Sequence, residues 1–406
     1  MAPRILIRAS SAIDARGETA PASLLVEGGE IIEIGTPQQV GDVPDARIVD
    51  ATDAVVLPGL VNAHCHLDLS GPGPVPFTGS FASWLDEVLH LRGDATPESM
   101  AAAVGRGIEL SLAGGTAFVG DIAGVPRTTQ LEVLRSSPLG GTCFPEFFGL
   151  GTRQQAAIEE MDSILAEHGG GDRDVLLGLS PHATYSCGPR AISHAVDRGV
   201  PVAIHVSESL EEARFLADGS GAFREKIERL GAWNEGVEIP GTHPVDYILD
   251  LLGDRPALLV HLNYVEPRHL DLLADANVTV AYCPRASDYF GHPSDGHHAY
   301  QAMIDHGIPV ALGTDSLLCL DTPDRISVLD EMRHLHRRDG TEVSTLMTMA
   351  THHAARGLGL DPSLVDFSPG ATGGVIAVGG VPEGGRFVDA LHLDEPPRWL
   401  VPPVSS

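Results

Sequence analysis

The chain has 406 residues, 43% of them hydrophobic, and its 55 acidic and 26 basic residues give a formal net charge of −29. This balance is typical of a globular protein and argues against binding to nucleic acid or anionic membrane surfaces, which attract basic proteins. We expect no signal peptide, because the N-terminus lacks a charged segment followed by a long apolar core, and no apolar run approaches about 20 residues. The five scattered cysteines fit a reducing, cytoplasmic compartment without disulfides.

Both ends of the chain are predicted to form one small β-sandwich domain, from residues 1–57 and 367–406. Short alternating apolar runs separated by turn residues are typical of such strands. Ser23–Gly35 is an example, with Gly28-Gly29 as a hairpin turn. Gly373–Gly379 is a further strand candidate, and we expect it to return to the N-terminal strands because helices precede it.

Residues 58–366 alternate apolar strands with helical patterns, which predicts an α/β fold, a (β/α)8 barrel of the TIM type. The strand candidates are near-continuous apolar runs, as expected for strands covered on both faces. They are centred on Val61, Phe118, Phe147, Leu177, Ile204, Val260, Val280 and Leu312. The predicted helices include Pro97–Leu112, Arg153–Glu167, Pro267–Asp275 and Asp324–Arg338. A doubly wound open sheet is the alternative, but it would need a glycine-rich turn where His64-Cys65-His66 stands.

Histidine and carboxylate side chains stand at the ends of four predicted strands. His64 and His66 are two residues apart on one strand, so their imidazoles can point the same way. His205, His261 and Asp315 end later apolar runs, and the strand ends of a barrel meet in one pocket. These side chains are fit ligands for Zn²⁺ or Fe²⁺. Taken alone, each histidine could be a core residue bonded to the backbone, and Asp315 a helix cap.

Glu208 follows His205 by three residues, so an ideal strand would turn it away from the pocket. If the strand ends near Ser207, the carboxylate can turn inward and act as a general base beside a metal-activated water. The alternative is a glutamate facing solvent in the first turn of a helix, since Glu211 and Glu212 follow.

Five segments together resemble the amidohydrolase superfamily over nearly the whole chain: Val56–Asp68, His205–Glu208, Val260–Asn263, Cys283–Arg285 and Gly313–Ser316. The chain is most similar to the mononuclear aminohydrolases, which include adenosine, S-adenosylhomocysteine, aminodeoxyfutalosine and guanine deaminases and triazine hydrolases. The resemblance implies one divalent metal ion, Zn²⁺ or else Fe²⁺, on His64, His66, His205 and Asp315. It also implies that Glu208 shuttles protons, that His261 polarises the water or the substrate, and that Asp315 helps to steer protons.

The chain contains a single lysine, Lys226, within Phe223–Leu230, a pattern of an exposed amphipathic helix. Binuclear members of the superfamily bridge two metals with a carboxylated lysine on the fourth strand. The corresponding run here, Asp174–His182, has no lysine. A dihydroorotase or hydantoinase type of site is therefore disfavoured.

Four residues are candidate substrate contacts. His182 lies in a segment that resembles the His-Ala-x-Tyr segment of the deaminases, where the histidine meets the purine ring or sugar, although a loop histidine beside a proline is an alternative. Phe81 and Trp84 lie in a segment that resembles the family's Phe-x-x-Trp-Leu loop over the substrate. The alternative is a helix that packs an aromatic stripe onto the barrel. Arg285 could hold a substrate carboxylate or pair with a nearby acid.

Two departures from the resemblance concern the substrate. Nucleoside-type relatives carry a glutamate for the ribose between the positions of Phe81 and Trp84, where this chain has Ala82 and Ser83. The segment Cys283–His292 is closer to the variant of aminodeoxyfutalosine-deaminase-like proteins.

We therefore predict a metal-dependent hydrolytic deaminase of an aminated heterocycle. The first choice of substrate is a 6-aminopurine nucleoside derivative of the aminodeoxyfutalosine, adenosine or S-adenosylhomocysteine type, with release of ammonia. A cyclic-amide or chloro-triazine hydrolase is the alternative with the same site. An inactive metal-containing binding protein is the alternative of another class. No nucleic acid or membrane partner is expected, and a homodimer is suggested by analogy with relatives.

Overall fold

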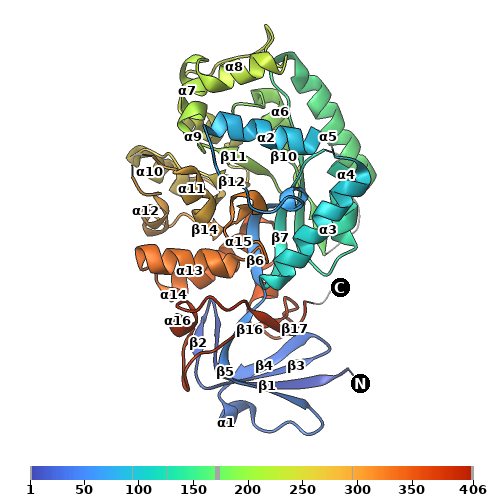
Figure 1. Cartoon of the computed structure of the whole chain (residues 1–406), viewed down its shortest axis with the longest axis vertical. Coiled ribbons are helices and arrows are strands. Elements are labelled where there is room, and N and C mark those ends of the chain that lie inside the picture. Colours follow the sequence, from blue (N-terminus) through green and yellow to red (C-terminus); the bar gives the residue numbers. More distant parts are fainter. Residues whose placement is uncertain (1, 94, 126, 170–173, 295, 404–406) are drawn as a thin grey trace.

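The structure, a computed structural model, describes all residues except 1, 94, 126, 170–173, 295 and 404–406. Figure 1 shows a barrel of strands and helices above a smaller sheet that contains strands from both ends of the chain. This arrangement confirms the predicted α/β barrel with an additional small domain. None of the helices in the described part of the chain is long and apolar enough to cross a membrane.

The small domain is built on one seven-stranded sheet in the order β17-β16-β5-β1-β3-β4, with β2 paired to β1. Its strands are β1 (Arg4–Asp14), β2 (Gly17–Thr19), β3 (Ala22–Glu27), β4 (Glu30–Gly35), β5 (Arg47–Pro58), β16 (Val375–Gly379) and β17 (Arg398–Val401). The predicted hairpin turn is present, with φ of 65° at Gly28 and 96° at Gly29. The strands predicted to form a sandwich are hydrogen-bonded into one sheet, in which β1 pairs with β2, β3 and β5.

The barrel wall consists of eight parallel strand positions within the described residues. They are β6 (Leu60–His66), β7 (Thr116–Ala123), β8 (Gly140–Phe147), β9 with β10 (Val175–Leu177, Ser180–Pro181), β11 (Ala203–Val206), β12 (Ala257–His261), β13 (Val278–Tyr282) and β14 with β15 (Val310–Leu312, Asp315–Ser316). Pairing of β15 with β6, and bridges from Leu179 to Val202 and from Ala183 to His205, close the ring. Each predicted strand centre lies in one of these strands.

The helices follow the strands in the order expected of a barrel. They are α2 (Phe81–Gly93), α3 (Pro97–Ala113), α4 (Arg127–Arg135), α5 (Gln154–His168), α6 (Pro189–Asp197), α7 (Leu210–Asp218), α8 (Ala222–Arg229), α9 (Pro244–Leu252), α10 (Pro267–Asp275), α11 (Pro284–Phe290), α12 (Tyr300–Asp305), α13 (Val328–Asp339), α14 (Val343–Ala350) and α15 (His352–Gly357). The boundaries of α10 agree with the prediction. α13 begins four residues later than predicted, after an irregular segment that ends at Ser327.

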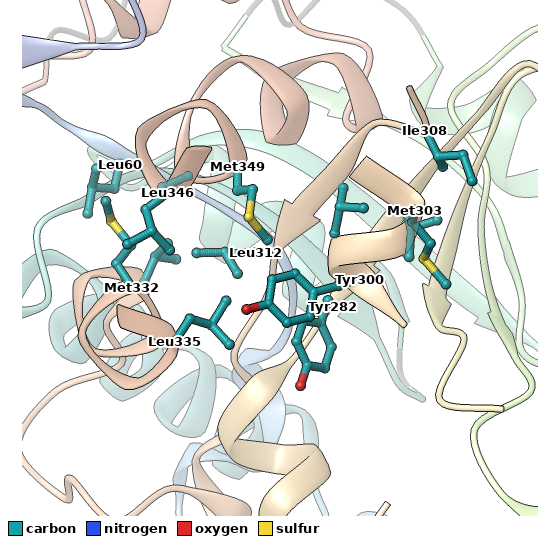
Figure 2. Packing of buried hydrophobic residues seen from close by; sticks show 14 of the residues in the cluster. Leu60, Tyr282, Tyr300, Met303, Ile308, Leu312, Met332, Leu335, Leu346 and Met349 are labelled. Carbon is teal, nitrogen blue, oxygen red and sulfur yellow. The ribbon is translucent and has the colours of Figure 1, made fainter. Parts of the chain in front are cut away.

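The largest hydrophobic cluster fills the space between the barrel strands and the outer helices. Figure 2 shows Leu312 of β14 among Met332 and Leu335 of α13 and Leu346 and Met349 of α14. All five side chains are fully buried. Burial of a side chain of this size stabilises the fold by about 1.5–3 kcal/mol. The cluster thereby holds the strands, and with them the strand ends that carry the site.

The prediction that α8 is exposed is wrong at its lysine. Lys226 is only 6% exposed, and its Nζ donates to Asp86 Oδ1 at 2.5 Å and to the Ala82 carbonyl at 3.2 Å. Both partners belong to α2, which lies against α8 at the barrel mouth. The helical pattern was correct, but a sequence pattern does not show which neighbouring element covers a helix. All five cysteines are free and buried.

Candidate active site

The predicted ligand residues converge at the carboxyl ends of the barrel strands. His64 and His66 end β6, His205 lies in β11, and Asp315 begins β15. The Nε2 atoms of His66 and His64 lie 3.5 and 3.9 Å from Asp315 Oδ1. The ring centroids of His64 and His205 are 5.0 Å apart. Residues from three separate strand positions therefore direct donor atoms towards one point.

Left-handed backbone conformations turn the chain into this site. The φ angles of Ser207, His261 and Asp315 are 53°, 75° and 59°, values that residues other than glycine rarely adopt. Such strain persists only where surrounding structure enforces it, and it is concentrated at functional sites. Strand β11 ends at Val206, and the turn at Ser207 brings Glu208 to the pocket, where an ideal strand would have turned it away.

The donor set fits a divalent transition metal. His64 is completely buried and neither of its ring nitrogens has a hydrogen-bond partner, which is costly for a polar group. His205 Nδ1 donates to the His182 carbonyl at 2.8 Å, which leaves the lone pair on Nε2 as a ligand. Burial lowers the pKa of His64 and His66, so both rings are neutral at pH 7. Ligand atoms around a tetrahedral zinc ion lie about 3.4 Å from one another. The distances from the Nε2 atoms of His66 and His64 to Asp315 Oδ1, 3.5 and 3.9 Å, are close to this value.

Glu208 and His261 form a second part of the site. Glu208 Oε1 lies 3.4 Å from His261 Nε2, and the two residues are 8% and 3% exposed. Burial and the neighbouring carboxylates of Asp315 and Glu212 raise the pKa of Glu208 well above its ordinary value. A carboxyl group with a raised pKa is suited to taking up and returning a proton near neutral pH.

Supporting hydrogen bonds hold Glu208 in position. Its backbone N–H donates to Glu212 Oε2 at 2.8 Å, and its carbonyl accepts from Asn263 Nδ2 at 3.0 Å. Sequence reasoning placed no role on Asn263, whose own amide oxygen accepts from Ser287. The side chain of Glu208 therefore extends from a backbone that is fixed on both sides.

The structure brings eight of the predicted site residues to one pocket. Its lining includes His66, Phe81, Trp84, His182, His205, Glu208, His261 and Asp315. His64 lies in the same ligand group with His66 and Asp315. Phe81 and Trp84 come from α2 and are 4% and 7% exposed, so this helix both packs on the barrel and lines the pocket.

Of the two predicted roles of Arg285, the structure shows the pairing with a nearby acid and not the placement needed to hold a substrate carboxylate in the pocket. Its Nε donates to Glu331 Oε1 at 2.6 Å and its Nη1 to Asp321 Oδ1 at 3.0 Å. Helix α11 begins at Pro284, directly after β13, and turns Arg285 towards α13. Arg285 therefore does not line the pocket that holds the histidines.

Sequence reasoning missed a buried charge network beside the ligands. Arg92, at the end of α2, donates from Nε to Asp68 at 2.7 Å and from Nη1 to Glu146 at 2.8 Å, and its Nη2 lies 3.2 Å from His66 Nδ1. Glu146 is an acid near the end of an apolar strand, the same signal that identified Asp315. Arg92 carried no such signal, because its position depends on how α2 folds back over the barrel.

The sequence and the structure of this chain are similar to those of several known proteins. A 5-methylthioadenosine/S-adenosylhomocysteine deaminase of Bacillus cereus (strain AH820) is 24% identical over 353 residues, which cover 83% of this chain and 76% of that protein. The structure of Helicobacter pylori aminofutalosine deaminase in complex with methylthio-coformycin has a TM-score of 0.81 and 22% identity, covering 98% of this chain and 99% of that one. Atrazine chlorohydrolase from Arthrobacter aurescens complexed with zinc has a TM-score of 0.72 and 21% identity, covering 92% and 86%. The model of the amidohydrolase family matches residues 55–382, and the chain therefore belongs to that family.

Proposed function

We propose that this protein is a metal-dependent hydrolase that removes the amino group of a 6-aminopurine nucleoside derivative as ammonia. The observation that carries the proposal is a set of overlapping buried groups of possible ligands. His64 lies with His66 and Asp315 in one group and with His205 and His261 in another, and Glu208 lies beside His261. The deaminases named among the similar proteins support this substrate class, and the zinc of atrazine chlorohydrolase supports zinc as the metal.

The metal, held by His64, His66, His205 and Asp315, would lower the pKa of a water molecule and so supply a nucleophile near neutral pH. Glu208 takes the proton from the attacking water and returns it to the ring nitrogen next to the reacting carbon. His261 holds the attacking oxygen. The water oxygen forms a bond to the carbon that carries the amino group, and the resulting hydroxyl group gives its remaining proton, through Asp315 or Glu208, to that amino group. The C–N bond then breaks, ammonia leaves, and the oxygen stays on the carbon as a carbonyl. Burial of these groups limits competing proton exchange with bulk water.

Hydrolysis of a chloro-triazine is the second candidate. It is favoured by the structural similarity to atrazine chlorohydrolase and by the composition of α2. Ala82 and Ser83 have no carboxylate with which to bind the hydroxyl groups of a ribose. The same metal and Glu208 would then activate the water that displaces chloride from the triazine ring.

The test is a screen of the purified chain, loaded with Zn²⁺ or Fe²⁺ and assayed for ammonia and chloride release. The substrates are adenosine, 5-methylthioadenosine, S-adenosylhomocysteine, aminodeoxyfutalosine and atrazine. We expect ammonia from at least one purine nucleoside, loss of activity with a chelator, and recovery when metal is added back. Chloride release alone would favour the second candidate. A protein that holds metal and turns over none of them would overturn both.

A further inference from the structure

Glu146 has one carboxylate oxygen that no group of the described protein satisfies. Glu146 is 1% exposed, and its Oε2 is paired with Arg92 at 2.8 Å. Its Oε1 has no hydrogen-bond partner. Two buried carboxylate oxygens in the described residues lack a partner, on Asp121 and Glu146, and only Glu146 lines the pocket with the metal-ligand residues. Because leaving such an oxygen unmet is costly, we expect a ligand or water to donate to it.

His182 faces the same oxygen across a gap. Its Nε2 lies 3.8 Å from Glu146 Oε1, too far for a direct hydrogen bond. The other ring nitrogen, Nδ1, is engaged by Ser186 Oγ at 2.6 Å. Nε2 therefore remains free for a ligand. It accepts a hydrogen bond if Nδ1 carries the ring proton and donates to Ser186, and it donates one if Ser186 donates to Nδ1. Hydroxyl groups suit this pair, because a hydroxyl always donates to a carboxylate and can meet Nε2 in either role.

The position of this pair indicates which part of a substrate it meets. Arg92 and His182 line both the metal-ligand pocket and an adjoining cavity of about 250 Å³. The cavity continues between α2 and α8 and is lined by apolar side chains such as Leu89, Phe148 and Leu230. A substrate whose ring reacts at the histidines and whose far end lies in this cavity would pass its middle portion between Glu146 and His182.

We propose that Glu146 determines substrate specificity by accepting a hydrogen bond from a hydroxyl group of a sugar. In such a substrate the sugar links the reacting ring to an apolar distal group. The inference rests on the proposed function and narrows it to hydroxylated nucleosides. It disfavours triazines, which bring no hydroxyl to this oxygen. Arg92 keeps the carboxylate charged and oriented, so Oε1 is a strong acceptor before the substrate arrives.

The test compares Glu146→Gln with the wild type on adenosine, 2′-deoxyadenosine and 3′-deoxyadenosine. A hydrogen bond to a charged group changes binding about tenfold to a hundredfold, so we expect the wild type to prefer adenosine over at least one deoxy form by that factor. Glutamine keeps an oxygen for Arg92 but turns an NH₂ towards the substrate hydroxyl. In the variant the preference should fall to about one, mainly through KM.

Glu331→Gln is the matched control, since it alters a comparable buried pair with Arg285 outside the pocket. It should leave the preference for adenosine unchanged. Glu146→Asp keeps the charge but moves the carboxylate oxygen away from the substrate, because the side chain is shorter. It should retain an intermediate preference for adenosine over the deoxy forms, and it replaces Glu146→Gln in the test if that variant is poorly folded. A wild type that deaminates no nucleoside would overturn the proposed function itself. Equal rates on all three nucleosides, or an equal loss on all three in Glu146→Gln, would overturn this inference alone.

Discussion

Replacing Glu208 by glutamine should abolish turnover while preserving the site around it. The substitution keeps the size of the side chain and both backbone hydrogen bonds, from the Glu208 N–H to Glu212 and from Asn263 to the Glu208 carbonyl. It removes only the ability to take up and return a proton. None of the four predicted metal ligands is altered, so metal content and thermal stability should stay close to the wild type.

The size of the effect follows from the role of the lost group. A positioned general acid–base contributes about a hundredfold to ten-thousandfold in rate, equivalent to about 3–5 kcal/mol of transition-state stabilisation. Because Glu208 both accepts the proton of the water and protonates the ring, we expect a loss in kcat at the upper end of this range. KM should change little, since the amide occupies the same space. The assay is steady-state ammonia release on the substrate that the screen identifies.

Glu211→Gln provides the control. Glu211 lies in the first turn of α7, three residues further on, and belongs to none of the metal-ligand groups in the described residues. This variant should retain full activity. If Glu208→Gln kept more than about a tenth of the wild-type kcat, Glu208 could not be the general base, given the contribution expected of one. A loss of metal from Glu208→Gln would instead show that the carboxylate holds the ion.

Three further predictions concern the same structure. Removing metal with a chelator should lower the melting temperature as well as the activity. Metal at a thousandfold excess over its Kd stabilises the native state by about 4 kcal/mol. An unchanged melting temperature would argue against a metal bound by buried His64. Arg285→Met should destabilise the protein in chemical denaturation by about 3–5 kcal/mol, since it leaves Glu331 charged and buried, while KM stays constant; a raised KM with normal stability would restore Arg285 as a substrate contact. Burial, and secondarily Asp68, raise the pKa of Asp121 to about 7. Between about pH 4 and pH 7 the unfolded chain therefore releases a proton that the folded chain keeps, so the contribution of Asp121 to the free energy of unfolding falls as pH rises. Asp121→Asn removes this contribution, so its free energy of unfolding should fall less, or rise more, with pH than that of the wild type; identical slopes in the two proteins would contradict the prediction.

The barrel could be predicted from the sequence because its signals are local. Parallel strands buried on both faces read as continuous apolar runs, and each predicted strand centre, from Val61 to Leu312, lies in an observed strand. The barrel topology then makes the strand ends meet, so a histidine or carboxylate at a strand end can be assigned to one pocket from the sequence alone. His64, His205 and Asp315 are brought together for that reason.

Other features depend on contacts between segments far apart in the chain, which no local pattern encodes. Lys226 is buried because α2 happens to cover α8, and Arg285 is withdrawn from the pocket because Glu331 of α13 lies beside it. Arg92 reaches Glu146 over 54 residues of sequence, and it engages one oxygen of a carboxylate that lines the pocket while the other oxygen has no hydrogen-bond partner. The residues for the proposed reaction can thus be found from their order in the sequence, whereas the positions of the groups proposed to select the substrate depend on how the covering helices pack.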